Sequence, residues 1–177
     1  MTKTESVVLG GGCFWCLEAA YAQLKGVTRV VPGYAGGSVP NPSYEQVCMG
    51  TTGHVEVVKV TFDTAVILLR DIMAVFWTIH DPTSLNRQGG DVGTQYASVA
   101  FYENEAQERA LRESQAEAQR YLETQIVTRI EPLDEFYEAE PEHHNYYETH
   151  PEAAYCQAVI EPKLSKLRGH FGSLLRS

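Results

Sequence analysis

The first half of the chain alternates between two hydrophobic periods. Short apolar runs at residues 6–9, 27–31 and 55–62 predict buried strands. Apolar positions recur at helical spacing over residues 13–24 and 65–80, and these two segments predict helices. Strands and helices therefore mix within a single stretch of about eighty residues, which is typical of a domain that contains both.

Two polar segments interrupt this pattern, and further elements follow them. Residues 32–53 are rich in Gly and Pro and are expected to form a long loop, and residues 82–93 a second one. Loops of such length inside a compact domain are usually functional. Beyond them we expect a strand at 94–102, a helix at 104–122 and a strand at 125–130.

The C-terminal residues 131–177 have the weakest periodicity. Residues 131–155 are rich in Pro, His and Tyr and are expected to be irregular, whereas residues 163–175 read as a short basic amphipathic tail. No repeat or linker divides the chain, and at roughly 150 residues per domain its 177 residues predict one domain, 1–177. The predicted fold class is α+β, a single-domain two-layer sandwich with a mixed, partly antiparallel sheet flanked by helices.

The charge balance excludes several classes of function. Fourteen Lys and Arg against 23 Asp and Glu give a net charge of −9, whereas binding to nucleic acid needs a surplus of basic side chains. No apolar stretch reaches the ~20 residues of a membrane span, and the N-terminus lacks the apolar run of about 7–15 residues of a secretory signal. We expect a soluble, cytoplasmic monomer that binds neither nucleic acid nor membrane.

Four cysteines remain as candidates for chemistry: Cys13, Cys16, Cys48 and Cys156. They are too few, in too long a chain, for the disulfide scaffold of a secreted protein. Cys13 and Cys16 form a Cys-x-x-Cys motif, but no second pair has metal-ligand spacing, so we expect no metal site. Cys48 is interpreted as a buried thiol.

Cys13 follows three glycines at the predicted start of a helix. The glycines let a substrate approach the backbone, and the free N–H groups of a helix start favour thiolate over thiol. We therefore expect a lowered pKa and a reactive Cys13. Phe14 and Trp15 point about 100° apart on a helix, so that one or both can line a pocket suited to a methyl group.

Several motifs together resemble one family. The string Gly12-Cys13-Phe14-Trp15 resembles the active-site motif of the A-type peptide methionine sulfoxide reductases. Cys16 stands where many relatives have glycine, so the chain resembles a subtype with a Cys-Phe-Trp-Cys motif. Further segments that resemble the family occur in the same order at residues 33–37, 44–48, 52–56, 80–83, 86–96 and 136–140.

The resemblance implies a ferredoxin-like fold and the reduction of the S epimer of methionine sulfoxide in proteins. Cys13 would attack the sulfoxide sulfur and be left as a sulfenic acid. The oxygen leaves poorly unless it is protonated, and the resemblance assigns this proton to Glu56. That role requires an apolar pocket that keeps the Glu56 carboxyl protonated.

The resemblance also implies the remaining contacts to the substrate. Tyr44, Asp91 and Tyr96 would hydrogen-bond the oxygen or a water. Phe14 and Trp15 would hold the methyl group and give selectivity for one epimer. These five side chains complete the predicted substrate site.

The family resemblance further implies a second thiol that resolves the sulfenic acid. Cys156, near the C-terminus, matches the family's usual resolving position and is favoured as the first resolver, with Cys16 as the alternative because a Cys-x-x-Cys closes a disulfide locally. Thioredoxin is the implied external reductant, and no prosthetic group is expected. His54 and His143, although they lie near matched segments, are interpreted as structural.

Two alternatives from other classes stay open. The Cys-x-x-Cys spacing by itself also suits a general thiol–disulfide oxidoreductase, in which Cys16 would be essential and Glu56 dispensable. A non-enzymatic domain could instead bind oxidised or methionine-rich segments through Phe14 and Trp15, and such binding would survive replacement of Cys13.

Overall fold

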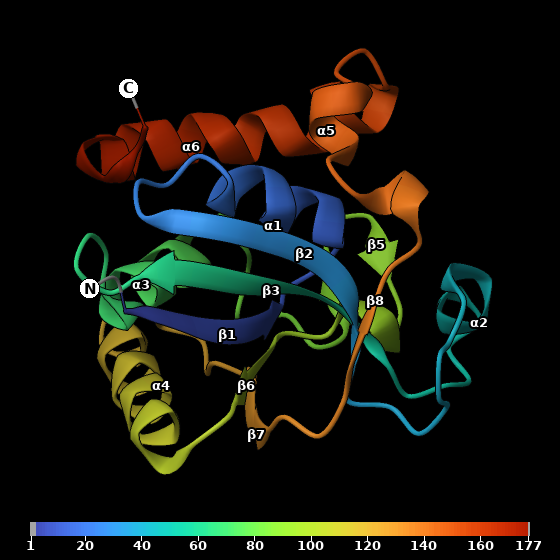
Figure 1. Ribbon diagram of the computed structural model, residues 1–177, viewed down its shortest axis with the longest axis horizontal. Helices are drawn as coiled ribbons and strands as arrows, with labels where there is room; N and C mark the ends of the chain where they lie inside the picture. Colours follow the sequence, from blue (N-terminus) through green and yellow to red (C-terminus); the bar gives the residue numbers. More distant parts are fainter. Residues whose placement is uncertain (1–2, 177) are drawn as a thin grey trace.

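The computed structural model describes residues 3–176, whose main sheet has six strands in the order β7-β6-β1-β3-β2-β8 (Figure 1). Neighbouring strands are antiparallel except β6 and β7, which are parallel. The predicted mixed, partly antiparallel sheet is therefore confirmed. The strands are β1 (Thr4–Gly10), β2 (Val27–Ala35), β3 (Val55–Asp63), β6 (Val99–Tyr102), β7 (Arg129–Pro132) and β8 (Phe136–Glu138).

The four central strands have a ferredoxin-like arrangement. Helix α1 (Phe14–Tyr21) connects β1 to β2, and helix α3 (Leu69–Ile79) lies between β3 and β6 in the chain. With the spatial order β6-β1-β3-β2, this is the β-α-β-β-α-β topology that the resemblance implied. Along β3 the side chains alternate between the two faces, so that Val58 and Val60 join the core beneath the helices and Val57 joins a smaller cluster on the other face.

Two further helices extend the helical side of the molecule. Helix α4 (Glu105–Gln119) packs on α3 and on β6 and β7, and helix α6 (Glu161–Phe171) packs against α1 and α3 (Figure 1). Leu164 and Leu167 of α6 are fully buried, so the basic tail is a packed helix. Among the residues described, no helix has the length and apolar character that crossing a membrane requires.

The expectation of one long loop over residues 32–53 is wrong. Strand β2 continues to Ala35 because it pairs with β3 on one side and with β8 on the other, where the Pro32 carbonyl accepts a bond from Ala139 N at 2.9 Å. A short helix, α2 (Tyr44–Cys48), follows. Its start is a capping box in which Ser43 and Gln46 bond each other's backbone N–H.

The later segments also differ from their predicted bounds. The strand expected at 94–102 starts only at Val99, after a 3-10 turn at Thr94–Tyr96, and the strand expected at 125–130 is shifted to β7. Residues 82–93 contain a two-strand hairpin. Residues 131–155, expected to be irregular, contain β8, a 3-10 turn and a short helix. The additional elements are β4 (Arg87–Gln88), β5 (Asp91–Val92), the turn Pro141–His143, α5 (Tyr146–Thr149) and the π-helical turn Cys156–Ile160.

Candidate active site

Cys13 lies between β1 and α1, at the residue that precedes the first helical turn. The backbone at Gly12 has φ +93°, a conformation that side chains rarely tolerate, and a Cβ there would lie 2.9 Å from the Gln88 side chain. Cys13 itself is extended, with φ −66° and ψ 130°, and only 7% exposed. The glycine turn thus places the thiol at a helix start, and it does so inside the protein.

Glu56 projects from β3 toward the same helix start and is fully buried. Phe14 N donates to its Oε1 at 3.1 Å, which satisfies one of the N–H groups that a helix leaves free. Its Oε2 has no hydrogen-bond partner among residues 3–176. Burial raises the pKa of Glu56 to about 8, although the bond from Phe14 N opposes this. At neutral pH the carboxyl is therefore protonated, with one oxygen free to meet a ligand.

Cys13 and Cys16 form a hydrogen-bonded pair of buried thiols. Burial raises the pKa of Cys13 well above its usual value, whereas the hydrogen bond from Cys13 lowers the pKa of Cys16 to about 7. The predicted lowering of the Cys13 pKa is thus wrong for the isolated protein, because burial outweighs the effect of the helix start. Within the pair, Cys16 is therefore the thiol that ionises first, and Cys13 keeps its proton.

Aromatic rings surround the thiol pair. Phe14 is fully buried, with ring centroids 5.7 Å from Tyr34, 6.2 Å from Tyr44 and 5.4 Å from His143. Trp15 is partly buried and stacks on Tyr146 at 3.7 Å and 7°. Both predicted aromatic residues therefore lie beside Cys13 in fixed orientations.

The three predicted polar partners come from three separate elements: Tyr44 from α2, Asp91 from β5 and Tyr96 from the 3-10 turn. Burial, and then the charge of Glu56, raise the pKa of both tyrosines, and for Tyr96 the charges of Asp91 and Cys13 add to this. Such mutual influence requires proximity. Tyr44, Asp91 and Tyr96 therefore lie near Glu56, and Tyr96 also lies near Cys13.

Glu140 also contributes to the site; it lies in the matched segment 136–140, but the sequence assigned it no role. Its carboxylate accepts a bond from the Tyr34 hydroxyl and another from Tyr44 N, each at 2.9 Å, and so ties α2 to the segment after β8. Burial opposes ionisation, but these bonds hold the pKa of Glu140 below its usual range. Its partners are 106 and 96 positions away, so no local pattern could have indicated the contact.

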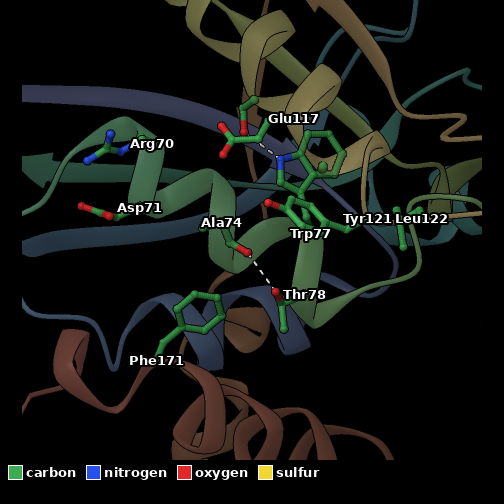
Figure 2. Close-up of a pocket in the computed structure, with 11 residues that line it drawn as sticks. Arg70, Asp71, Ala74, Trp77, Thr78, Glu117, Tyr121, Leu122 and Phe171 are labelled. Carbon is green, nitrogen blue, oxygen red and sulfur yellow. Dashed lines mark hydrogen bonds between the residues drawn. The ribbon is translucent and has the colours of Figure 1, made fainter.

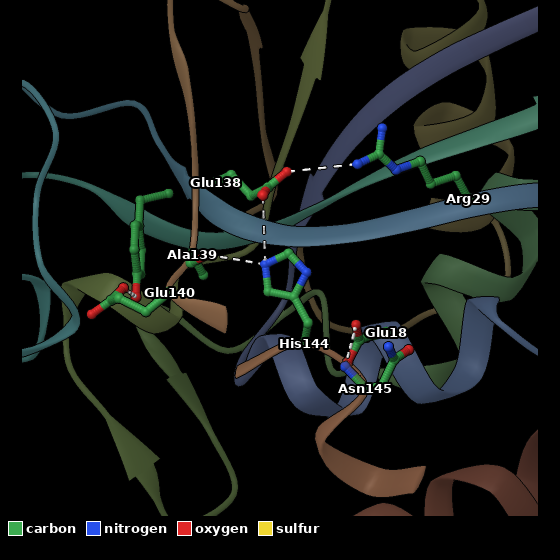
Figure 3. Close-up of polar contacts among 8 residues, drawn as sticks. Glu18, Arg29, Glu138, Ala139, Glu140, His144 and Asn145 are labelled. Carbon is green, nitrogen blue, oxygen red and sulfur yellow. Dashed lines mark hydrogen bonds and ion pairs between the residues drawn. The ribbon is translucent and has the colours of Figure 1, made fainter. Parts of the chain in front are cut away.

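The segment that carries Glu140 is itself fixed to the helical layer (Figure 3). His144 Nε2 bonds the Ala139 carbonyl at 2.9 Å, and Asn145 N donates to Glu18 Oε2 of α1 at 2.9 Å. His143, which lies between Glu140 and His144 in the chain, was interpreted as structural. Its ring lies 4.3 Å from that of Tyr44, and its Nδ1 accepts a bond from Trp15 Nε1 at 3.3 Å, so that it fixes the orientation of the substrate-site aromatics.

The other predicted residues lie farther from this centre or in a different environment. Cys156 is fully buried in the π-helical turn before α6. The prediction that Cys48 is buried is wrong: Cys48 is exposed, because the short α2 turns only Val47 into the core. His54 bonds Gly37 N and the Val39 carbonyl through its two ring nitrogens, contacts that hold the glycine loop.

A separate groove between α3 and α4 has a different character (Figure 2). It is lined by Trp77, Tyr121 and Phe171 together with charged side chains such as Arg70 and Glu117. Trp77 Nε1 donates to Ser114 Oγ at 2.8 Å. No cysteine is among its described lining residues, so we assign the thiol chemistry to the Cys13 site.

Comparison with known proteins agrees with the geometry of the Cys13 site. The family model described as "Peptide methionine sulfoxide reductase" matches residues 5–174. The chain belongs to the peptide methionine sulfoxide reductase family. It is 52% identical to the reductase MsrA of Chromobacterium violaceum over 175 residues, 98% of this chain and 99% of that protein. It is also 52% identical to MsrA of Saccharolobus solfataricus over 162 residues, 92% of each chain.

Solved structures of the family agree as well. The reduced form of Mxr1 from Saccharomyces cerevisiae matches with a TM-score of 0.82 and 36% identity, over 87% of this chain and 90% of that one. Mxr1 in complex with Trx2 matches with a TM-score of 0.59 and 27% identity, over 81% and 85%. The mixed α+β fold of this chain is therefore that of its family.

Proposed function

We infer that this chain is a peptide-methionine (S)-S-oxide reductase, which returns the S epimer of methionine sulfoxide in proteins to methionine with electrons from thiols. Membership of the family supports this reaction. The observation that carries it is the buried Cys13 thiol beside the protonated Glu56, whose Oε2 has no partner among residues 3–176. That oxygen is available to hydrogen-bond a sulfoxide, whose own oxygen must receive a proton as its S–O bond breaks.

In the first step a thiolate on Cys13 attacks the sulfoxide sulfur. Transfer of the Cys13 proton to the Cys16 thiolate leaves a thiolate on Cys13 at the helix start. Glu56 gives a proton to the oxygen. The attack forms an S–S bond between Cys13 and the substrate sulfur. The protonated oxygen then passes to the Cys13 sulfur as the S–O bond and the new S–S bond to the substrate both break, which releases methionine and leaves Cys13 as a sulfenic acid. The substrate sulfur is reduced by two electrons and the Cys13 sulfur is oxidised by two.

The surrounding side chains orient this exchange. Phe14 and Trp15 form the apolar wall against which the methyl group of the sulfoxide rests, and this contact selects the S epimer. Tyr44 and Tyr96 stay protonated because their pKa values are raised, so both hydroxyls can donate to the oxygen. The Asp91 carboxylate accepts hydrogen bonds from donors in the site and so orients them. A hydrogen bond to the oxygen becomes stronger as charge develops on it, and this lowers the barrier.

A second cysteine then resolves the sulfenic acid, Cys156 and Cys16 being the two candidates, and thioredoxin reduces the resulting disulfide. The solved complex of the relative Mxr1 with Trx2 supports thioredoxin as the partner. Thiols alone balance the reaction, so the proposal includes no prosthetic group. It assigns the enzyme, a monomeric single catalytic domain, to the cytoplasm, where thioredoxin keeps thiols reduced.

Turnover of S- and R-sulfoxide peptides, with dithiothreitol or thioredoxin as reductant, tests this function. Wild type is expected to reduce the S epimer only, and Cys13→Ser to reduce neither. Absence of turnover of both epimers by wild type would overturn the proposal. If the same protein then reduced a disulfide substrate through Cys16, the general thiol–disulfide oxidoreductase would replace it.

A further inference from the structure

Tyr155 contacts two groups of the thiol site at once. Its hydroxyl donates to Asp91 Oδ2 at 2.7 Å and lies 3.6 Å from Cys16 Sγ. Its ring meets Trp15 edge-on, with centroids 5.7 Å apart at 81°. The C-terminal segment therefore reaches into the site through Tyr155, one residue before Cys156.

The two candidate resolving thiols, Cys16 and Cys156, differ in how readily they ionise. In the reduced protein the hydrogen bond from the Cys13 thiol lowers the pKa of Cys16 to about 7. Two contacts that do not depend on the Cys13 thiol also favour the Cys16 thiolate: the charge of Lys163, and the Tyr155 hydroxyl 3.6 Å from Cys16 Sγ. Burial raises the pKa of Cys156, and the charge of Cys16 raises it further. Because the thiolate is the nucleophile, Cys16 is the better prepared of the two while the protein is in this conformation.

Cys156 is also held by its backbone. It begins a π-helical turn that continues into α6, and Ile160 and Leu164 of this helical stretch are fully buried. Cys16 lies one helical turn from Cys13, with Cys16 N donating to the Cys13 carbonyl at 3.1 Å. A disulfide between them closes a loop of only a few residues and leaves α6 in place.

We propose that Tyr155 is a positioning residue that holds Cys16 ready to attack the Cys13 sulfenic acid before Cys156 does. The inference rests on the proposed function, because it concerns the step after methionine leaves. While Cys16 is a thiol, the Tyr155 oxygen can accept its S–H and donate to Asp91. Once Cys16 is ionised, the same hydroxyl can turn and donate to the sulfur.

The step balances without any added oxidant. The Cys16 thiolate attacks the Cys13 sulfur, the S–S bond forms and the S–O bond of the sulfenic acid breaks. The leaving hydroxide takes up a proton and departs as water. The product is a Cys13–Cys16 disulfide, which Cys156 or thioredoxin can open by thiol–disulfide exchange.

Several charged and titratable groups influence Cys16, and they determine how its ionisation responds to Tyr155. Lys163 of α6 favours the thiolate and Asp91 opposes it. Without the Tyr155 hydroxyl, the Asp91 carboxylate faces the thiolate with no shared donor between them. The groups concerned are Cys13 before α1, Glu56 on β3, Asp91 on β5, Tyr155 and Cys156 before α6, and Lys163 on α6.

A single-turnover experiment tests the order of resolution. Protein without reductant receives one equivalent of an S-sulfoxide peptide, the reaction is quenched at intervals, and disulfides are mapped by mass spectrometry. Cys156→Ala is expected to form the Cys13–Cys16 disulfide as fast as wild type forms its first disulfide, whereas Cys16→Ser accumulates sulfenic acid. Rapid disulfide formation in Cys16→Ser together with a persistent sulfenic acid in Cys156→Ala would overturn the proposal.

The pH dependence of the same step tests Tyr155. In Tyr155→Phe the midpoint of disulfide formation is expected to rise by about one pH unit, which slows the step about tenfold below the midpoint and restores it at high pH. Tyr121→Phe, at a side chain 82% exposed, is the matched control with an unchanged midpoint. An unshifted midpoint in Tyr155→Phe would contradict the positioning role.

Methionine release, measured in the same samples, separates this inference from the function on which it rests. Absence of methionine from wild type overturns the proposed function. Release of one methionine by Cys156→Ala without a Cys13–Cys16 disulfide leaves the function intact and overturns the inference alone.

Discussion

Cys13 and Cys156 occupy similar places in two regions of the molecule, yet they differ in their neighbours. Each is buried at the beginning of a helical segment, and burial raises the pKa of each thiol. Both thiols belong to the same buried cluster, but Cys13 is hydrogen-bonded to Cys16 and is influenced by the charge of Glu56, whereas the pKa of Cys156 is shifted only by burial and the charge of Cys16. Reactivity therefore depends less on the helix start than on polar groups brought from distant parts of the chain.

The largest difference is expected between the variants in which Cys13 or Cys156 is replaced. Cys13→Ser is expected to release no methionine, because no sulfur is left to accept the oxygen. Cys156→Ala is expected to release one methionine per protein molecule, since its thiol acts only after that step. Product analysis after a single turnover measures both. Methionine release by Cys13→Ser would contradict the assignment of Cys13, rather than Cys156, as the thiol that accepts the oxygen.

Glu56→Gln should cause the next largest loss. Loss of a general acid lowers the rate by about 10²–10⁴-fold. In wild type the carboxyl donates while protonated, so the rate is expected to fall as pH rises through about 8, the raised pKa of Glu56. The variant should lack this decline, and a full pH–rate profile of both proteins shows whether it does. An identical decline in both would assign it to another group.

Glu56→Gln is also expected to change the stability of the protein. At high pH the variant should be more stable than wild type, although it is less active. Its folded pKa lies above its unfolded value, so its contribution is greatest at low pH and is lost as pH rises toward about 8. Above pH 8 the free energy of unfolding of Glu56→Gln is expected to be roughly 1–3 kcal/mol greater than that of wild type, because the variant has no buried charge at this position. Urea titrations at pH 5 and pH 9 test this, and a variant that is less stable at pH 9 would contradict it.

Glu140→Gln tests how far the Cys13 region depends on long-range contacts. Loss of two hydrogen bonds to a charged carboxylate is expected to lower the free energy of unfolding by about 1–3 kcal/mol at pH 7. The folded pKa of Glu140 is lowered, so this difference should shrink as pH falls. Glu138→Gln is the matched control, because its ion pair with Arg29 is exposed and 3.7 Å long. Equal effects of the two changes would contradict the assignment.

The smallest effect is expected at Lys163. Its charge favours the Cys16 thiolate, so Lys163→Met should raise the pH midpoint of disulfide formation by a few tenths of a unit. Lys163 and Lys166 both line the cleft that Asp91 and Tyr155 border. Lys166→Met therefore makes the same change in net charge, but Lys166 does not influence the pKa of Cys16. Stopped-flow measurements over pH 6–9 compare them. A larger shift in Lys166→Met would contradict the role of Lys163.

The matched motifs indicated which residues lie close together better than periodicity indicated the segments that carry them. Cys13, Glu56 and Asp91 lie within matched motifs, and the structure brings them together. The bounds of β2 and the presence of α2 were missed, because pairing with β8 and capping by Ser43 and Gln46 outweigh a composition rich in Gly and Pro. Contacts between residues a hundred positions apart leave no periodic pattern in either segment.

The same limit explains the wrong expectations for two thiols. The helix start at Cys13 predicted a lowered pKa, but the thiol is buried in a cluster that includes residues from far along the chain. Cys48 was expected to be buried, and its exposure follows from the single inward residue of α2. Ionisation and burial of one side chain are properties of the packed fold.

The central claim is that oxygen passes from the substrate to the Cys13 sulfur. The most direct measurement uses the double variant Cys16→Ser, Cys156→Ala, which receives one equivalent of an S-sulfoxide peptide and then dimedone, a reagent for sulfenic acids. We predict one methionine released and one dimedone adduct per molecule, on Cys13, with none from the R epimer. Release of methionine without an adduct on Cys13, or an adduct without methionine, would contradict the account.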